Sequence, residues 1–436
     1  MAGAFPWNAP VRTIARSAGI GGGVALIVQK YGGTSVADVE RIRNVARRCL
    51  AARRRGDDVV VVASAMAGET DRLLGLVRRV AAHPDRREQD QVVAAGEQVT
   101  VGLLSLAIQA EGGQARSFLG HQVRIVTDGA FTRARIRSID AGRIHEALAD
   151  GRIAVVAGFQ GIDEAGNVTT LGRGGSDTTP VAIAAALRAD ACEIYTDVDG
   201  VFTTDPNVCP SARKLSRIAY EEMLELASQG AKVLQIRSVG LAMRYRVPLW
   251  VKSSFTDEPG TLVCVEDGAM EELAVAGIAF DRNEAKVAIR GCPDVPGVVA
   301  RVFAPLAEAG IVVDMIVQNV SRDGRTDVTF TVGAADLDRA EAIAADVVRA
   351  IGAERVEVDR GVAKVSIVGV GMRDQAGVAA KMFETLASLG VNIQAISTSE
   401  IKVAVLIEAG RLEAAVNALH RAFGLEAPDK AARAAS

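Results

Sequence analysis

The chain has 436 residues, a formal net charge of −3 and a pI of about 6.0, and 49% of its residues are hydrophobic. This balance gives no electrostatic reason to expect nucleic acid or an anionic membrane as a partner. No apolar run reaches the roughly 18 residues of a membrane span, and the length predicts about three domains.

The two ends of the chain differ in composition from the middle. Residues 1–23 hold two prolines, two arginines and a run of three glycines, without the apolar segment of about 7–15 residues that a signal peptide needs. We expect a disordered extension here, or sequence upstream of a true start at Val24, with a transit peptide as the other interpretation. Residues 426–436 are expected to form a flexible tail.

Strand and helix patterns alternate between residues 24 and 265. Residues 59–64 are mostly valine, which indicates a strand covered on both faces, as in a parallel sheet. Short loops join the segments, so the pattern predicts an α/β sandwich around one sheet. The expected strands are 25–30, 59–64, 123–127, 153–159, 193–196 and 248–251, and the expected helices are 37–55, 88–111, 139–149, 177–188 and 219–229.

Past residue 265 the chain contains an internal repeat with an offset of 80 residues. Residues 294–310 and 374–390 are identical at eight of 17 positions. Each copy reads as a glycine-containing loop and a helix between two apolar strands, and such a duplicated small unit indicates a regulatory module. The expected strands are 287–290 and 311–316 in the first copy, and 364–368 and 391–396 in the second.

Lys30, Gly32 and Gly33 directly follow the first expected strand. Glycines let backbone N–H groups approach an anion closely, and Lys30 would add a point charge for a phosphoryl group. The spacing is not that of a Walker A motif. A purely structural Gly-Gly turn therefore fits this stretch equally well.

A second glycine-rich stretch, residues 171–179, combines Arg173 and Asp177 with three glycines before an expected helix. Ser176 or Asp177 could cap that helix, and Pro180 fits its first turn. A flexible, capped loop is the alternative interpretation. An Arg flanked by glycines favours a two-pronged contact with a substrate carboxylate.

Two further segments offer weaker signals. Residues 195–206 follow a strand and are rich in carboxylates and turn-forming residues. They predict a nucleotide-facing loop at the carboxyl end of the strand, with a solvated turn as the alternative. Lys232 lies close to Gly230, but most single lysines are surface residues.

Glu97 lies within a largely apolar helical stretch. A buried glutamate needs a partner, so an ammonium ligand is one interpretation and a structural pair is the other. Thr70, in the segment that follows the valine-rich strand, is a further candidate for the same site.

Together these segments resemble the aspartate kinases of the amino-acid kinase family, from about Val24 to Gly424. The resemblance implies an amino-acid kinase fold, a three-layer α/β/α sandwich around a mainly parallel sheet, at 24–265. Two ACT-type α+β domains (βαββαβ) would follow at 266–350 and 351–425, with the strand at 273–280 shared with the second. The matching segments, in order, are VQKYGGTSVADVERI, VVASAMAGETDRL, GFQG, TLGRGGSDTT, IYTDVDGVFTTDP, GAKVLQIRS, DMIVQNVS and ISTSEI.

The resemblance also implies a role for each matching residue. The two lysines would neutralise the transferring phosphoryl group and the aspartate would position them, which makes the catalytic set Lys30, Asp177 and Lys232. The set that binds aspartate would be Ser64, Thr70, Glu97, Arg173 and Ser176. The set that binds ATP would be Lys30, Gly32, Gly33, Thr196, Asp197, Phe202, Asn207 and Lys232.

The implied reaction converts ATP and L-aspartate to ADP and 4-phospho-L-aspartate, the first step toward lysine, threonine, methionine and diaminopimelate. Mg²⁺ would bridge the nucleotide phosphates, with no metal ligand from protein side chains. The resemblance implies a cytoplasmic homo-oligomer joined through the ACT domains, and five cysteines without a CxxC pair fit reduced thiols. Lysine and/or threonine would bind as effectors at Asp294, Gly297, Gln318, Asp374, Gln375 and Gly377.

Some positions depart from the family pattern. Phe202, Asn207 and Trp250 stand where the family usually has Tyr, Arg and Arg. In the second repeat, residues 374–377 read Asp-Gln-Ala-Gly where the family commonly has Ser-His-Pro-Gly. Because that loop borders an effector pocket in the family, we expect altered or weakened feedback inhibition.

Two other functions remain compatible with these motifs. One is a different amino-acid kinase, acting on glutamate, acetylglutamate or a nucleotide monophosphate. The other is a non-catalytic, ACT-bearing regulatory homologue, which the changes at Phe202 and Asn207 would fit. The retained Lys30, Asp177 and Lys232 favour an active enzyme.

Overall fold

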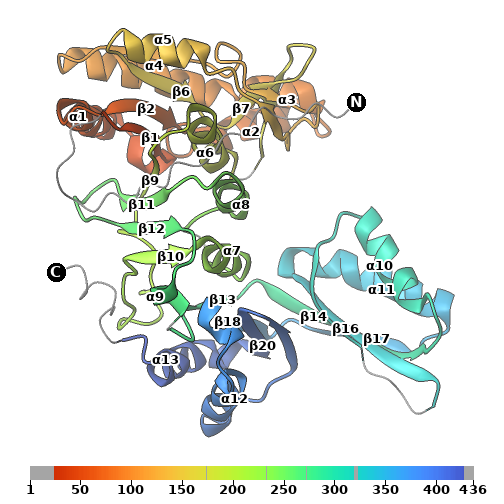
Figure 1. The fold of residues 1–436 in the computed structure, drawn as a ribbon. Coiled ribbons are helices and arrows are strands. Elements are labelled where there is room, and N and C mark those ends of the chain that lie inside the picture. Colours follow the sequence, from red (N-terminus) through yellow and green to blue (C-terminus); the bar gives the residue numbers. More distant parts are fainter. Residues whose placement is uncertain (1–23, 173, 232, 272, 319–322, 427–436) are drawn as a thin grey trace. The chain divides into compact units, whose positions relative to one another are not determined.

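The computed structural model describes residues 24–172, 174–231, 233–271, 273–318 and 323–426. These residues form two compact units (Figure 1). The first unit comprises residues 24–201, 214–224 and 233–267, and the second comprises residues 202–213, 225–231 and 268–426.

The first unit is built around an eight-stranded sheet with the strand order β10-β12-β11-β9-β1-β2-β6-β3. Neighbouring strands run parallel except β11 and β12. The predicted α/β fold with a mainly parallel sheet is confirmed. The strands are β1 (Leu26–Tyr31), β2 (Asp58–Ala63), β3 (Ala115–Phe118), β6 (Ile153–Ala157), β9 (Ala191–Thr196), β10 (Arg217–Ala219), β11 (Leu249–Ser253) and β12 (Thr261–Cys264).

Helices cover both faces of this sheet. Helices α1 and α4 pack on one face, where Val59 and Val61 of β2 enter their common core. Val60 and Val62 are buried on the opposite face, because successive strand residues point to opposite sides, and α6 and α8 pack together there. The helices are α1 (Val39–Arg54), α2 (Glu69–Val80), α3 (Arg86–Val93), α4 (Ala95–Ala110), α5 (Gly142–Ala149), α6 (Gly175–Leu187), α7 (Tyr220–Ser228) and α8 (Ile236–Tyr245), with a 3-10 turn at Gly33–Val36.

Helices α3 and α4 follow each other almost without interruption. The stretch Arg86–Ala110 is long and apolar enough to cross a membrane by length and composition alone. Half of its most apolar window is buried inside the protein, and it carries the buried carboxylates Asp90 and Glu97. These features are those of a core helix of a globular domain.

The predicted strand at 123–127 does not join the main sheet. Only Val126–Thr127 forms a strand, β4, and it pairs with β5 and β7 in a separate four-stranded sheet. The apolar run was misread because Val123 and Ile125 are buried without being part of a strand, and Arg124 has a left-handed backbone. The other strands of this sheet are β5 (Ile136–Ser138), β7 (Gln160–Ile162) and β8 (Val168–Thr170).

The second unit contains two antiparallel four-stranded sheets, ordered β15-β16-β14-β17 and β13-β18-β20-β19. The earliest strand of this region, β13, pairs with β18 of the later copy rather than with β14. The strands are β13 (Gly277–Asp281), β14 (Glu284–Pro293), β15 (Val313–Gln318), β16 (Arg325–Gly333), β17 (Arg355–Asp359), β18 (Val362–Val368), β19 (Ala395–Ser399) and β20 (Lys402–Glu408).

Two helices cover one face of each of these sheets, and the repeat seen in the sequence has one shape in both copies. Gly297 and Gly377 each precede a helix of eleven residues, and both have φ +90°. The helices are α10 (Val298–Glu308) and α11 (Leu337–Ile351) in the first copy and α12 (Val378–Ser388) and α13 (Leu412–Ala422) in the second, and a short α9 (Gly268–Glu271) comes before both.

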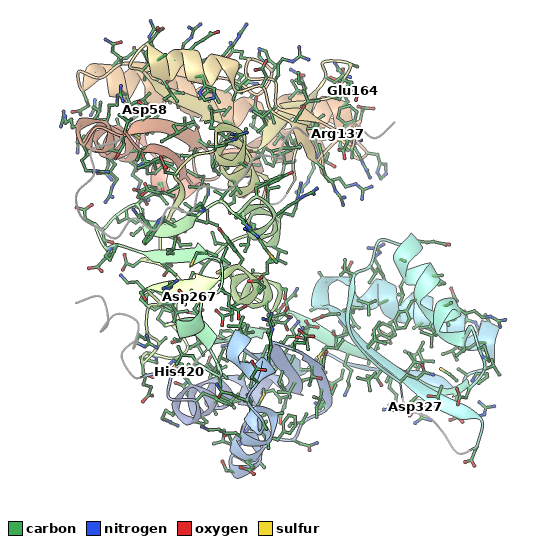
Figure 2. All side chains as sticks on the ribbon, viewed as in Figure 1. Asp58, Arg137, Glu164, Asp267, Asp327 and His420 are labelled. Carbon is green, nitrogen blue, oxygen red and sulfur yellow. The ribbon has the colours of Figure 1, made fainter. Side chains whose placement is uncertain are left out.

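Residues 202–213, early in the chain, belong to the second unit and pack on α13. The hydroxyl of Thr203 lies 2.9 Å from Nε2 of His420, which is fully buried and is labelled in Figure 2. The side-chain amide of Asn417 donates to the carbonyl of Val208 at 2.9 Å. The sheet β13-β18-β20-β19 and its helices therefore fold together with a segment that lies between parts of the first unit in the sequence.

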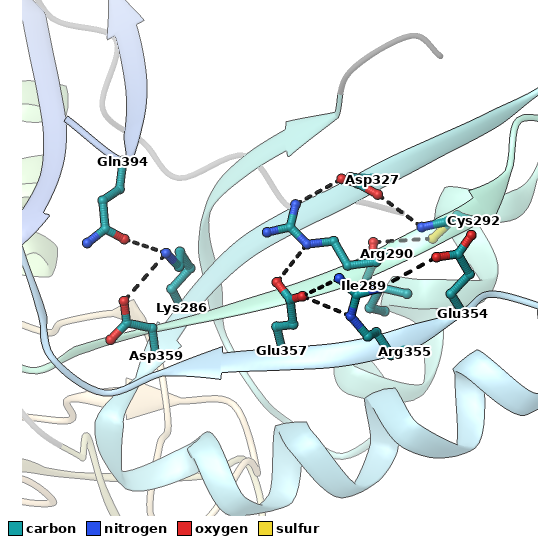
Figure 3. A network of polar contacts seen from close by, with 11 residues as sticks. Lys286, Ile289, Arg290, Cys292, Asp327, Glu354, Arg355, Glu357, Asp359 and Gln394 are labelled. Atoms are coloured by element: carbon teal, nitrogen blue, oxygen red, sulfur yellow. Dashed lines mark hydrogen bonds and ion pairs between the residues drawn. The ribbon is translucent and has the colours of Figure 1, made fainter. Parts of the chain in front are cut away.

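Ion pairs cross the first ACT-type sheet on the face opposite its helices (Figure 3). Arg290 of β14 contacts Asp327 of β16 and Glu357 of β17, both at 2.8 Å. Lys286 of β14 lies 3.5 Å from Asp359 of β17. Opposite charges on directly neighbouring strands fix the strand register in addition to the apolar core on the helix side.

Candidate active site

The parallel register of three central strands brings the predicted loops to one edge of the sheet. Tyr31 of β1 pairs with Ala63 of β2 and with Tyr195 of β9. Gly32, Ser64 and Thr196 directly follow these three residues, so they leave the sheet at the same carboxyl edge. Ligands bind at this edge in open α/β sheets.

Lys30 and Asp177 form a largely buried ion pair at this edge. The Lys30 Nζ atom lies 2.6 Å from Oδ1 of Asp177, and only 8% of Lys30 is exposed. Lys30 comes from the end of β1 and Asp177 from the first turn of α6, so the pair joins two of the segments singled out in the sequence. A Cβ atom on Gly32 would lie 3.2 Å from the Lys30 Nζ atom, so Gly32 leaves room for the ammonium group.

A second chain of close contacts connects the glycine turn to Glu97. A Cβ atom on Gly33 would lie 3.0 Å from the carbonyl oxygen of Ala65. The backbone N–H of Ala65 donates to Oε1 of Glu97 at 3.1 Å. The glycine turn after β1 therefore packs against the loop after β2, and the Glu97 carboxylate accepts a hydrogen bond from that loop.

The Glu97 carboxylate has unused hydrogen-bonding capacity. Only 2% of the residue is exposed, and its Oε2 atom has no hydrogen-bond partner among the described residues. Burial raises the pKa of Glu97 to about 7, and backbone hydrogen bonds of Ala65 and of Glu97 itself only partly oppose this effect. A buried carboxylate with a free oxygen is suited to a cation such as an ammonium group.

The loop before α6 differs from the capped turn that the sequence predicted. Gly174, with φ +74°, is the residue before the helix, and no side chain caps it. The prediction that Ser176 or Asp177 caps the helix is wrong, because the helix already begins at Gly175. Pro180 consequently lies in the helix interior rather than in its first turn. The Asp177 side chain does not cap the helix and forms an ion pair with Lys30 instead.

The other predicted binding residues of the first unit lie at the carboxyl ends of strands or in the first turn of a helix. Thr70 is in the first turn of α2, and Ser64 directly follows β2. Thr196 ends β9, and its hydroxyl donates to Oδ1 of Asp197 at 3.1 Å. Arg173 and Lys232 lie outside the described residues.

Phe202 and Asn207 belong to the second unit. The backbone N–H and the side-chain amide of Asn207 both donate to Oδ1 of Asp205, at 2.8 and 3.0 Å. These bonds close a turn and account for an Asn at this position without any ligand.

The predicted effector-binding residues are all exposed in the second unit. Those of the first copy surround the start of α10 and the end of β15, and those of the second copy lie just before α12. Asp294 is held by its backbone N–H, which donates to the carbonyl of Gly324 at 2.8 Å. The residues are Asp294, Gly297, Gln318, Asp374, Gln375 and Gly377.

Sequence reasoning did not single out Asp90, a buried carboxylate of α3. Only 1% of it is exposed, and it accepts hydrogen bonds from Thr132 and Thr170 next to the loop that leads to Asp177. The available signal was its spacing: Asp90 lies seven residues before Glu97, on the same side of an apolar helix.

No group of three His, Cys, Asp or Glu side chains that could hold a metal ion occurs among the residues described. The Asp177 carboxylate, which lies against Lys30, is already engaged in an ion pair.

Comparison with known families agrees with this architecture. Residues 25–253 match the amino acid kinase family, and residues 287–349 and 365–423 each match the ACT domain. The chain is 56% identical over 406 residues to the aspartate kinase of Pseudomonas putida, covering 93% of this chain and 99% of that one. It is 51% identical over 413 residues to the aspartokinase of Mycolicibacterium smegmatis, covering 94% and 98%.

Solved structures show the same fold at lower identity. Escherichia coli aspartokinase III in complex with aspartate and ADP (R-state) matches with a TM-score of 0.75 and 27% identity, covering 91% of this chain and 99% of that one. The same enzyme in complex with lysine and aspartate (T-state) matches with a TM-score of 0.73 and the same coverage. The chain therefore belongs to the aspartate kinases of the amino-acid kinase family, with two ACT domains in its C-terminal part.

Proposed function

We propose that this protein transfers the γ-phosphoryl group of ATP to the side-chain carboxylate of L-aspartate. The observation that carries the proposal is the buried Lys30–Asp177 pair, 2.6 Å across, at the carboxyl edge of the sheet beside the start of α6. Identities of 51–56% to enzymes named for this reaction support the same substrate.

The reaction asks little covalent work of the protein. The acceptor carboxylate of aspartate is already ionised at neutral pH, so no general base is needed. The enzyme aligns two negatively charged reactants and neutralises the charge that spreads over the phosphoryl oxygens in the transition state. Lys30 supplies positive charge there, Lys232 supplies a second, and Asp177 fixes the Lys30 ammonium group in position.

Aspartate would bind between α4 and the loop before α6. Its ammonium group would complete the coordination of Glu97, whose free Oε2 atom is buried without a partner among the described residues. Its carboxylates would be held by Arg173 and Ser176, with Ser64 and Thr70 completing the pocket. Binding the ammonium group favours the charged form of Glu97, so substrate and carboxylate each stabilise the other's charge.

The nucleotide would lie along the carboxyl ends of β1 and β9. Gly32 and Gly33 would donate backbone N–H groups to its phosphates, while Thr196 and Asp197 would contact the remainder. Mg²⁺ would enter with ATP and shield the phosphate oxygens.

The reaction can be tested directly by trapping the acyl phosphate. Purified protein, ATP and Mg²⁺ are incubated with hydroxylamine and a panel of aspartate, glutamate and N-acetylglutamate, and the hydroxamate formed is measured. We expect product with aspartate and at least about a hundredfold lower kcat/KM with the longer acids. Preference for another acid would identify a different amino-acid kinase, and no product with any acid would favour a regulatory homologue.

The remaining expectations concern domains and regulation. We propose a catalytic domain at 24–265 and ACT domains at 266–350 and 351–425, the last two forming a homo-oligomer that binds lysine and/or threonine. The substitution of Asp-Gln-Ala-Gly for the usual loop at 374–377 supports weakened inhibition. The enzyme would act in the cytoplasm at the first step toward lysine, threonine, methionine and diaminopimelate.

A further inference from the structure

Asp90 is a buried carboxylate that the phosphoryl-transfer chemistry does not use. It lies on α3 with 1% of its surface exposed. Its Oδ2 atom accepts from the backbone N–H groups of Thr132 and Thr170, both at 2.8 Å, and its Oδ1 atom accepts from the Thr170 hydroxyl at 2.7 Å. Three hydrogen bonds engage both oxygens, so neither oxygen of Asp90 is left without a partner.

The two residues that donate hydrogen bonds to Asp90, Thr132 and Thr170, both lie next to the short segment of residues 171–172. Thr170 ends β8 and immediately precedes Leu171 and Gly172. Thr132 has φ +68°, which is a strained value for a β-branched residue. A Cβ atom on Gly172 would lie only 2.7 Å from the carbonyl oxygen of Thr132. Asp90 therefore maintains a strained turn that packs directly against Gly172.

A backbone hydrogen bond connects this segment to the helix that carries Asp177 of the Lys30–Asp177 ion pair. Leu171 donates its backbone N–H to the carbonyl of Phe159, and Gly175 donates to the carbonyl of Gly172, both at 2.9 Å. Gly175 begins α6, and Asp177 in the first turn of α6 contacts Lys30. We call residues 170–172 and 174–177 the acceptor loop. Its first residues are fixed by Asp90 and its last residue fixes Lys30.

The same helical stretch also carries Glu97. Seven residues separate Asp90 from Glu97, so the two carboxylates lie about two helical turns, or roughly 10 Å, apart on one side of the helix. Between them, the carbonyl of Ala94 accepts from Nε2 of the buried Gln160 at 3.0 Å, which ties the helix to β7. The helix is therefore anchored to the acceptor loop at one end and carries the proposed ammonium ligand at the other.

We propose that Asp90 is a positioning residue that sets the distance between Glu97 and the acceptor loop, and through it the length of the amino acid that the site accepts. Asp90 touches no substrate atom. The inference rests on the proposed function, because it assigns the ammonium group to Glu97 and the carboxylates to the acceptor loop. A displacement of about 1 Å in such a geometry can cost on the order of a hundredfold in rate.

The test compares four single variants in the full-length protein. Asp90→Ala removes both acceptor oxygens and with them all three hydrogen bonds, and Thr170→Val removes only the hydroxyl. Asp90→Asn keeps an oxygen for the two backbone N–H groups and offers its amide to the Thr170 hydroxyl. Glu88→Gln, two residues before Asp90 in the same helix, alters an exposed carboxylate and serves as the matched control.

We expect Asp90→Ala to raise the KM for aspartate at least about tenfold and to leave the KM for ATP within about twofold. The preference for aspartate over glutamate in kcat/KM should fall in the same variant. Thr170→Val should change both quantities in the same direction by about threefold, since two of the three bonds remain. Asp90→Asn and Glu88→Gln should resemble the unmodified protein.

Several outcomes would overturn the inference. One is an Asp90→Ala variant with unchanged KM for aspartate, and another is a parallel rise of both KM values with unchanged selectivity, which would indicate general loosening. If Asp90→Ala does not fold, Thr170→Val decides between the same outcomes. Failure of the unmodified protein to phosphorylate aspartate would instead refute the proposed function, so the two failures are distinguishable.

Discussion

The kinase part and the two ACT domains share one backbone feature, a left-handed glycine before a helix, but this glycine is closely packed in the first and open in the other two. A glycine in the left-handed region precedes α6, α10 and α12, at Gly174, Gly297 and Gly377. A Cβ atom on Gly174 would lie 2.7 Å from Cγ of Gln235. At Gly297 and Gly377 the same atom would meet nothing within 4 Å.

This difference in packing distinguishes the proposed active-site loop at Gly174, which must be rigid, from the loops at Gly297 and Gly377, which need not be rigid. Catalysis of phosphoryl transfer relies on charges and dipoles held in place before the reaction, and close packing around Gly174 provides that restraint. The exposed loops before α10 and α12 have space for a ligand or for small movements. The open loops therefore suit binding of an effector, and the packed loop suits catalysis.

Removing the Lys30 charge tests the packed region most strongly. Lys30→Ala deletes the charge that we propose to bind phosphate and leaves Asp177 without its partner in a largely buried position. We expect kcat to fall at least about a thousandfold in the hydroxamate assay. Lys381→Ala, on α12 of the second ACT domain, should leave kcat unchanged. Turnover close to normal in Lys30→Ala would refute the assigned role.

Removing the Glu97 charge should act mainly on aspartate binding. We expect Glu97→Gln to raise the KM for aspartate by roughly tenfold to a hundredfold, because the ammonium group loses a buried charged partner. In the unmodified enzyme the KM for aspartate should rise as pH falls below about 7, since the Glu97 carboxylate becomes protonated. Steady-state kinetics between about pH 6 and about pH 8, roughly one unit on either side of that pKa, would measure this change.

The same variant makes a prediction for stability. The pKa of Glu97 is raised from 4.5 to about 7 in the folded protein, so its contribution to stability is present at low pH and is lost as pH rises through that window. Glu97→Gln should therefore stabilise the substrate-free enzyme above pH 7, by up to about 3 kcal/mol. A pH-independent KM for aspartate in the unmodified protein would argue against both effects.

A pair of glycine substitutions compares the two regions directly. Gly174→Ala adds a contact with Gln235 to the strain of a left-handed alanine, so we expect it to lower the free energy of unfolding by about 2–4 kcal/mol and to reduce kcat. Gly377→Ala carries the strain alone, about 1–2 kcal/mol, and should keep full activity without effector. Urea denaturation measures both, and equal losses would show that the packing difference is unimportant.

The smallest effect is expected from the effectors. The loop at 374–377 lacks the usual family residues, so lysine and threonine, added singly and together, should change activity by no more than about twofold at sub-millimolar concentration, an effect worth under roughly 1 kcal/mol of coupling. Titration of each amino acid against hydroxamate formation measures this effect. Strong inhibition in that range would show that the altered loop still supports feedback control.

Most of the fold followed from local patterns in the chain. The expected strands at 25–30, 59–64, 153–159, 193–196 and 248–251 correspond to β1, β2, β6, β9 and β11. They were predictable because strands buried on both faces consist of continuous apolar residues. The same criterion gave a wrong prediction for residues 123–127, because the buried residues Val123 and Ile125 lie in a loop rather than in a strand.

The sequence by itself determined the family, the order of the motifs and the duplicated ACT unit, because identity, spacing and hydrophobic period are properties of the chain alone. Only the tertiary structure decided that Asp177 meets Lys30 instead of capping α6, that residues 202–213 pack on α13, and that Asp90 supports the acceptor loop. These contacts join residues 42 to 217 positions apart. No local pattern encodes them, since they depend on which surfaces are brought together when the sheets form.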